Sequence, residues 1–195
     1  MKRTLTRPAA ALLTVLAAAL TPVALAQQMT PAQLMADQQK MMAPLSWMNG
    51  EWRGPATILL PDGKTHIITQ PEKIGPMQDG TLKILHGRGY EADGTASFDA
   101  FAVVAYDSYD KTFNITSFSG GNAGKFTFKP TADGYIWDVP EGPVTLRYTA
   151  VFKDGTWTET GENIAEGKPP VKNFQMVLNR IGDTDWPNAD LVPMK

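Results

Sequence analysis

The chain has 195 residues and a formal net charge of −2, with 18 lysines and arginines against 20 aspartates and glutamates. This balance disfavours a nucleic-acid partner, which requires a basic face, and docking on an anionic membrane surface. Cysteine does not occur in the sequence, which excludes disulfides and a cysteine-linked lipid anchor, so hydrophobic burial has to stabilise the fold.

The N-terminus has the pattern of a cleaved secretory signal. Lys2, Arg3 and Arg7 form a positive segment, and an apolar stretch follows over residues 9–20. Small residues at both ends of the triplet Ala24–Ala26 occupy the two positions that a signal peptidase reads. The apolar stretch is short for a membrane span, so we expect residues 1–26 to be removed and the mature protein to be periplasmic or secreted. An uncleaved anchor helix is the alternative.

Residues 27–46 are predicted to form a short helix and its lead-in. Thr30 suits the N-cap, Pro31 the first helical position, and Gln33 completes a capping box. Apolar residues then recur at three- and four-residue spacings until Pro44 ends the helix. We expect this stripe to pack across one end of the following domain. Its methionines fit apolar packing better than copper binding, so no metal site is expected.

Over residues 47–182 the sequence alternates with the period of β-strands, between turn dipeptides such as Asp62-Gly63 and Asp154-Gly155. Consecutive hairpins favour a closed antiparallel up-and-down β-barrel, because closure removes exposed strand edges. A β-sandwich is the competing architecture. Residues 183–195 are predicted to be an extended tail with Trp186 against the outer wall. The strands are predicted over residues 51–60, 64–70, 81–91, 97–106, 112–119, 125–129, 135–139, 144–153, 156–164 and 171–181.

The triplet Gly50-Glu51-Trp52 opens the first predicted strand, directly after the helix. A Gly-x-Trp in this place resembles the entry of lipocalin and calycin barrels, and its extension through Gly54 resembles the nitrobindin-like branch with ten strands. With segments 87–94, 103–113 and 133–142, nearly all of the mature chain is similar to an uncharacterised family of exported bacterial lipocalin-like proteins. The resemblance implies a closed barrel and carries no established activity.

This motif also has a physical interpretation. Gly50 lets the chain turn sharply into the strand, and Trp52 is expected to point inward and close one end of the barrel. In lipocalins a basic residue of the last strand lies over this tryptophan, and Arg180 is predicted at the corresponding end. We therefore expect a cation–π contact of about 0.5–2 kcal/mol, and a structural role for Gly50, Trp52, Gly54 and Arg180.

A polar cluster is the main candidate site. His86, Arg88 and Tyr90 share one face of the third predicted strand. If that face points inward, these side chains lie in an apolar lumen, with Glu159 as a counter-charge. The opposite orientation, which places Leu85 inward, is left open by the alternation.

Inward-facing aromatic residues, among them Trp137 and Tyr148, either fill the lumen or line a pocket. We expect a protein without catalytic residues that binds a small apolar or amphiphilic ligand in the lumen. A hydrolase or isomerase that uses the inward His, Arg and Glu cluster, and a solid barrel with a structural or interaction role, are the alternatives. The candidate ligand contacts are His86, Arg88, Tyr90, Glu159, Trp137 and Tyr148.

The resemblance raises the possibility of a haem cofactor, because nitrobindin-like barrels bind haem through a histidine late in the chain. The two histidines of this sequence are His66 and His86, and the last predicted strands contain none. This departure argues against haem, and no cofactor is expected. The oligomeric state is not indicated by the sequence.

Overall fold

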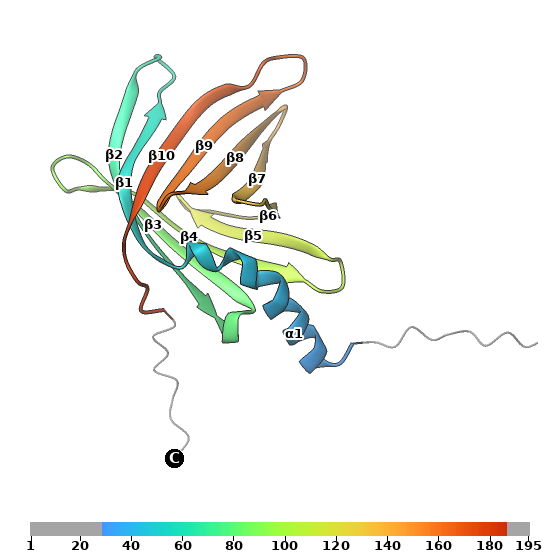
Figure 1. Cartoon of the computed structure of the whole chain (residues 1–195). Helices are drawn as coiled ribbons and strands as arrows, with labels where there is room; N and C mark the ends of the chain where they lie inside the picture. The colour runs from blue at the N-terminus through green and yellow to red at the C-terminus, as the bar shows by residue number, and fades with distance from the viewer. Residues whose placement is uncertain (1–28, 187–195) are drawn as a thin grey trace, which may run out of the picture.

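The computed structural model describes residues 29–186, which form a closed barrel of ten antiparallel strands preceded by a helix (Figure 1). Each strand pairs with the next along the chain, and β10 pairs with β1 to close the ring. The predicted up-and-down barrel is confirmed, and the sandwich alternative is wrong. The elements are α1 Pro31–Met42, η1 Ala43–Met48, β1 Gly50–Leu59, β2 Thr65–Met77, η2 Gln78–Gly80, β3 Leu82–Tyr90, β4 Ala96–Asp107, β5 Thr112–Ser119, β6 Asn122–Pro130, β7 Gly134–Glu141, β8 Val144–Lys153, β9 Thr156–Ala165 and β10 Val171–Gly182.

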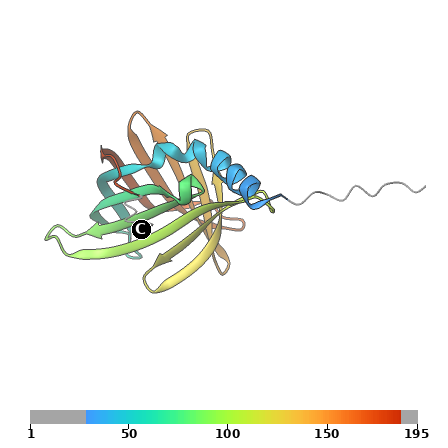
Figure 2. The ribbon, with the colours of Figure 1, turned by 90° about the horizontal axis from the view of Figure 1, so that it is seen from below.

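The N-terminal helix starts as its sequence predicts. The backbone N–H of Gln33 donates to the Thr30 hydroxyl oxygen, and the backbone N–H of Thr30 donates to the Gln33 side chain, which is a complete capping box. Pro44 ends α1 and falls inside the short 3₁₀ helix η1. The helix contacts β3, β4 and η2, so it lies against one end of the barrel, as expected (Figure 2).

An aromatic cluster that includes Trp47 of η1 closes that end of the barrel. Trp47 stacks on Phe152 with ring centroids 5.1 Å apart. Trp52 is fully buried, and its Nε1–H donates to the carbonyl oxygen of Met48 over 2.9 Å. Its indole meets Phe152 and Trp157 edge to face. We call this cluster the aromatic floor, and it consists of Trp47, Trp52, Tyr135, Phe152 and Trp157.

Arg180 lies beside Trp52 and does not stack on it. The two residues are cross-strand partners on β10 and β1, so they share one end of the barrel. The guanidinium donates instead to the carbonyl oxygen of Asn49 over 3.1 Å and pairs with Asp183 over 2.7 Å. Aromatic edges surround Trp52, and the expected cation–π contact is not formed within residues 29–186.

Two glycines of β1 permit the closure onto β10. Gly50 has a φ of 141°, and a Cβ atom there would lie 2.8 Å from Nε of Arg180. At Gly54 a Cβ atom would collide with the backbone carbonyl of Val177. Glycine is therefore required at Gly54 by the close approach of the two strands, and at Gly50 by the backbone conformation as well.

Trp186, just beyond β10, packs on the outer wall, where the sequence predicts it. A Cβ atom on Gly75 of β2 would lie 2.6 Å from Cβ of Trp186, and Nζ of Lys73 lies 5.4 Å from the indole centroid. The predicted signal segment 1–26 and the rest of the tail lie outside the described residues. Within 29–186, no helix has the length and apolar character needed to cross a membrane.

Candidate functional site

The barrel encloses a cavity of about 550 Å³ that extends from the aromatic floor to the opposite, open end. At the open end lie the turns that follow β1, β3, β5, β7 and β9. The volume falls in the range of about 300–1,000 Å³ that is common for small-molecule sites. The lumen is therefore not filled by side chains. Its aromatic lining consists of Phe98, Phe101, Tyr135, Trp137, Tyr148, Trp157 and Phe174.

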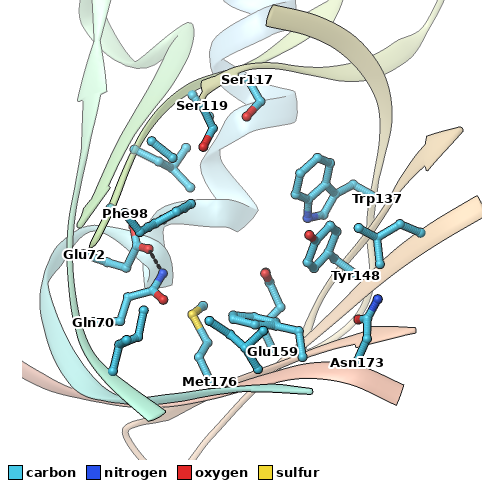
Figure 3. A pocket seen from close by; sticks show the side chains of 18 of the residues that line it. Gln70, Glu72, Phe98, Ser117, Ser119, Trp137, Tyr148, Glu159, Asn173 and Met176 are labelled. Carbon is cyan, nitrogen blue, oxygen red and sulfur yellow. Dashed lines mark hydrogen bonds between the residues drawn. The ribbon is translucent and has the colours of Figure 1, made fainter. Parts of the chain in front are cut away.

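Flat aromatic surfaces face the cavity from two sides. Trp137 and Tyr148 are stacked, with centroids 4.5 Å apart and planes 13° from parallel. The ring of Phe174 meets Tyr148 edge to face at 6.0 Å. Phe98 faces them from the other side of the cavity (Figure 3). The alternation of β7 and β8 predicts the inward position of Trp137 and Tyr148 correctly.

Two carboxyl groups, which we call the carboxyl pair, point into the cavity near the aromatic floor (Figure 3). Glu72 lies on β2, opposite Trp52 in the strand register, and Glu159 lies on β9 and is 8% exposed. Nε2 of Gln70 donates to Oε1 of Glu72 over 2.6 Å. The hydroxyl of Tyr135 donates to Oε2 of Glu159. Each carboxyl is thus held by one side-chain donor.

The apolar surroundings make ionisation of this pair costly. Burial raises the pKa of Glu72 to about 8, opposed by the hydrogen bond from Gln70 and assisted by the charge of Glu159. Burial also raises the pKa of Glu159 to about 7, opposed by the Tyr135 hydrogen bond. The pKa of Tyr135 lies well above its usual value because the hydroxyl is buried beside these carboxyls. Both glutamates therefore exchange protons close to neutral pH, while Tyr135 stays a donor.

The polar cluster predicted on β3 points outward. Leu85 lines the cavity, whereas His86 and Arg88 contact Asp99 on β4 over 2.9 and 3.1 Å. The guanidinium of Arg88 lies 5.5 Å from the ring centroid of Tyr90. The inward placement of His86, Arg88 and Tyr90 is therefore wrong, and the other orientation left open by the alternation is the observed one.

Two glycines, Gly87 and Gly89, lie on the inward face of β3 in this orientation. Gly87 is the cross-strand partner of Glu72, and a Cβ atom there would collide with the Glu72 carboxyl. A Cβ atom on Gly89 would lie 2.5 Å from Cδ1 of Ile68. The glycines on the inward face of β3 therefore leave room for the side chains of Glu72 and Ile68 on β2. Of the predicted ligand contacts, Glu159, Trp137 and Tyr148 line the cavity.

Glu72 and Gln70 are cavity residues that the sequence reasoning missed. The second predicted strand stops at residue 70, before Pro71, whereas β2 continues to Met77. Pro71 lies opposite Arg53 of β1, so pairing runs on through the proline. Gly87 and Gly89 in the next strand could have indicated these residues, because glycine in a strand marks a place where a neighbouring side chain needs space.

The cavity residues do not fit a haem held by a histidine of the last strands. His66 lines the cavity, but Nε2 of this residue lies 3.1 Å from Oε1 of Glu91, at the open end. His86 faces outward, and β8, β9 and β10 contain no histidine. Within the part of the chain that the structure describes, no group of three or more His, Cys, Asp and Glu side chains is arranged to hold a metal ion.

Comparison with known proteins supports the fold. No protein-family model matches the sequence, and no curated protein matches it. The chain is similar in structure to Rv2717c from M. tuberculosis, with a TM-score of 0.55 and 13% identity over 72% of this chain and 96% of that one. It is also similar to the S-type phycobiliprotein lyase CPES from Guillardia theta, with a TM-score of 0.50 and 8% identity over 76% and 98% of the two chains. At such identities the similarity shows a shared lipocalin-like barrel fold.

Proposed function

We propose that this protein binds a small apolar or amphiphilic molecule in the barrel lumen and does not transform it. The cavity of about 550 Å³, closed at one end by the aromatic floor, is the observation that supports this proposal. Burial of the ligand against the apolar walls supplies about 25 cal/mol per Å² before the costs of association. The stacked rings of Trp137 and Tyr148 suit a ligand with a flat or extended apolar part.

The proposal extends to location and to chemistry. On the signal pattern over residues 1–26 we place the protein in the periplasm or outside the cell, and the mass of the mature protein tests cleavage after Ala26. The proposed ligand binding requires no metal and no haem. The enzymatic alternative depended on an inward His, Arg and Glu cluster, and the outward orientation of His86 and Arg88 removes that basis.

Blocking the lumen tests the proposal. Ser117 lines the cavity, whereas its neighbour Thr116 points to the outer face of β5. Ser117→Trp should place an indole in the lumen, and Thr116→Trp is the matched control. The probe is N-phenyl-1-naphthylamine, an uncharged apolar fluorophore, titrated into the folded protein.

We expect saturable binding of one probe molecule, weakened about 10-fold or more by Ser117→Trp, a loss of at least about 1.4 kcal/mol of binding free energy. Thr116→Trp should change the affinity by less than about 2-fold, well under 1 kcal/mol. Equal loss of affinity in the two variants would show that the probe binds elsewhere. Thermal melts of both variants establish that the barrel is intact.

A further inference from the structure

Charge is distributed unevenly in the cavity. Its floor end carries the carboxyl pair, and none of the described residues that line it is a lysine or an arginine. His66 is the cationic candidate, and it lies at the open end, paired with Glu91. An anionic ligand would therefore meet no counter-charge beside Glu72 and Glu159.

Each member of the carboxyl pair has a vacant acceptor oxygen. Oε1 of Glu72 accepts from Gln70, and Oε2 of Glu159 accepts from Tyr135. Neither of the two remaining oxygens has a hydrogen-bond partner among the described residues, and both carboxyls are directed into the cavity (Figure 3). Both carboxyls line the cavity, so a donor group on a bound ligand can reach these free oxygens.

We propose that the ligand carries a basic nitrogen, as an amine or an amidine, whose N–H groups donate to Glu72 and Glu159 at the floor of the lumen. The proposal rests on lumen binding as proposed above and names the chemical class of the ligand. The apolar part of the ligand then lies along Trp137, Tyr148 and Phe98, between the carboxyl pair and the open end.

The chemistry of the pair favours a cation over other polar groups. Hydrogen bonds between charged partners are about twice as strong as neutral ones, and the apolar cavity reduces screening by water. An ammonium group offers three donors and accepts none, which matches the free acceptor oxygens of Glu72 and Glu159. Burial raises the pKa of Glu72 and of Glu159, which agrees with this role, since no cation among residues 29–186 pairs with either carboxyl.

The test uses three ligands that share a ten-carbon chain and differ in the head group: decylamine, decanol and decanoic acid. Their dissociation constants are measured at pH 7.5 by displacement of N-phenyl-1-naphthylamine from the full mature chain. Glu72→Gln and Glu159→Gln keep the size of each side chain and remove its charge. Asp99→Asn, on the outer face of β4, removes an acidic charge that does not line the cavity and is the matched control.

We expect decylamine to bind about 10-fold more tightly than decanol, and decanoic acid to bind more weakly than either, because a hydrogen bond between charged groups contributes about 1.5–3 kcal/mol. Each glutamine variant should weaken decylamine about 10-fold and leave decanol within about 2-fold. Asp99→Asn should leave both affinities unchanged.

Two failures are distinguishable. If all three ligands bind with similar affinity, or if the glutamine variants bind decylamine as tightly as the unmodified protein does, the head-group proposal is wrong while lumen binding stands. If none of the three displaces the probe and Ser117→Trp has no effect on the probe, lumen binding itself is wrong, and the head-group proposal falls with it.

Discussion

Replacing Trp52 tests whether the aromatic floor holds the barrel together. The indole is fully buried, meets Phe152 and Trp157 edge to face, and donates to the carbonyl oxygen of Met48. Removal of a buried tryptophan to alanine costs about 3–5 kcal/mol from lost transfer energy and the cavity left behind. Since single domains unfold with about 5–15 kcal/mol, Trp52→Ala should remove about a fifth or more of the stability.

Trp52→Phe separates packing from hydrogen bonding. Phenylalanine retains an aromatic ring against Phe152 and Trp157, and leaves the Met48 carbonyl oxygen without its donor, which should cost about 1–3 kcal/mol. Trp186→Ala is the control on the outer wall, and it should cost less than half as much as Trp52→Ala. Urea unfolding at an unchanged m-value measures all three. A cost for Trp52→Ala no larger than that for Trp186→Ala would refute a structural floor.

Three further predictions concern buried charges and the strand contact at closure. Folding raises the pKa of Glu159 from 4.5 to about 7, so its contribution to stability is fully present below pH 4.5 and is lost as the pH rises through about 7. Glu159→Gln should flatten that decline, by up to about 3 kcal/mol at pH 8, in unfolding free energies measured from pH 4 to 8. Burial lowers the pKa of Lys83 to about 8, so its stability contribution is present above its unfolded pKa of 10.5 and lost as the pH falls through about 8. Lys83→Met removes the buried charge together with the donor that Nζ supplies to Oδ1 of Asn49, so it should flatten the fall in unfolding free energy between pH 10.5 and 8 by up to about 3 kcal/mol, and an unchanged pH dependence in urea would contradict this. Gly54→Ala should cost about 2 kcal/mol or more because its Cβ atom collides with the carbonyl of Val177, whereas Gly182→Ala, whose nearest contact is 3.9 Å away, should cost little in thermal melts.

Local chemistry accounts for what the sequence predicts well. The capping box of Thr30 and Gln33 needs only neighbours along the chain, and α1 begins as predicted. The hairpin turns are equally local, and β5 and β8 match their predicted bounds. Consecutive hairpins leave few topologies, so closure of the barrel follows from avoidance of exposed edges.

The candidate site depends on the relation between strands, which alternation alone does not determine. β3 carries apolar residues on both faces, Ile84 on one and Leu85 on the other, so neither orientation is favoured by hydrophobicity. The deciding feature is the packing of Gly87 against Glu72, a contact between two strands. Glu72 in turn follows Pro71, and proline is a poor strand former in isolation. The failure to predict Glu72 and the wrong orientation of β3 therefore have the same cause, which is that both depend on contacts between strands.

The placement of the carboxyl pair is hard to explain by stability. A floor that only closed the barrel would need apolar side chains, as Trp52 and Trp157 already provide. Glu72 and Glu159 instead lie against that floor with raised pKa values, so their ionisation opposes folding at neutral pH. β3 also accommodates Glu72 by giving up a side chain at Gly87. Groups that weaken the fold and still receive space within it are typical of binding and catalytic sites, where stability is exchanged for function. On the proposal made above, a basic ligand would reverse this penalty, because it would supply a counter-charge that none of the described residues lining the cavity provides.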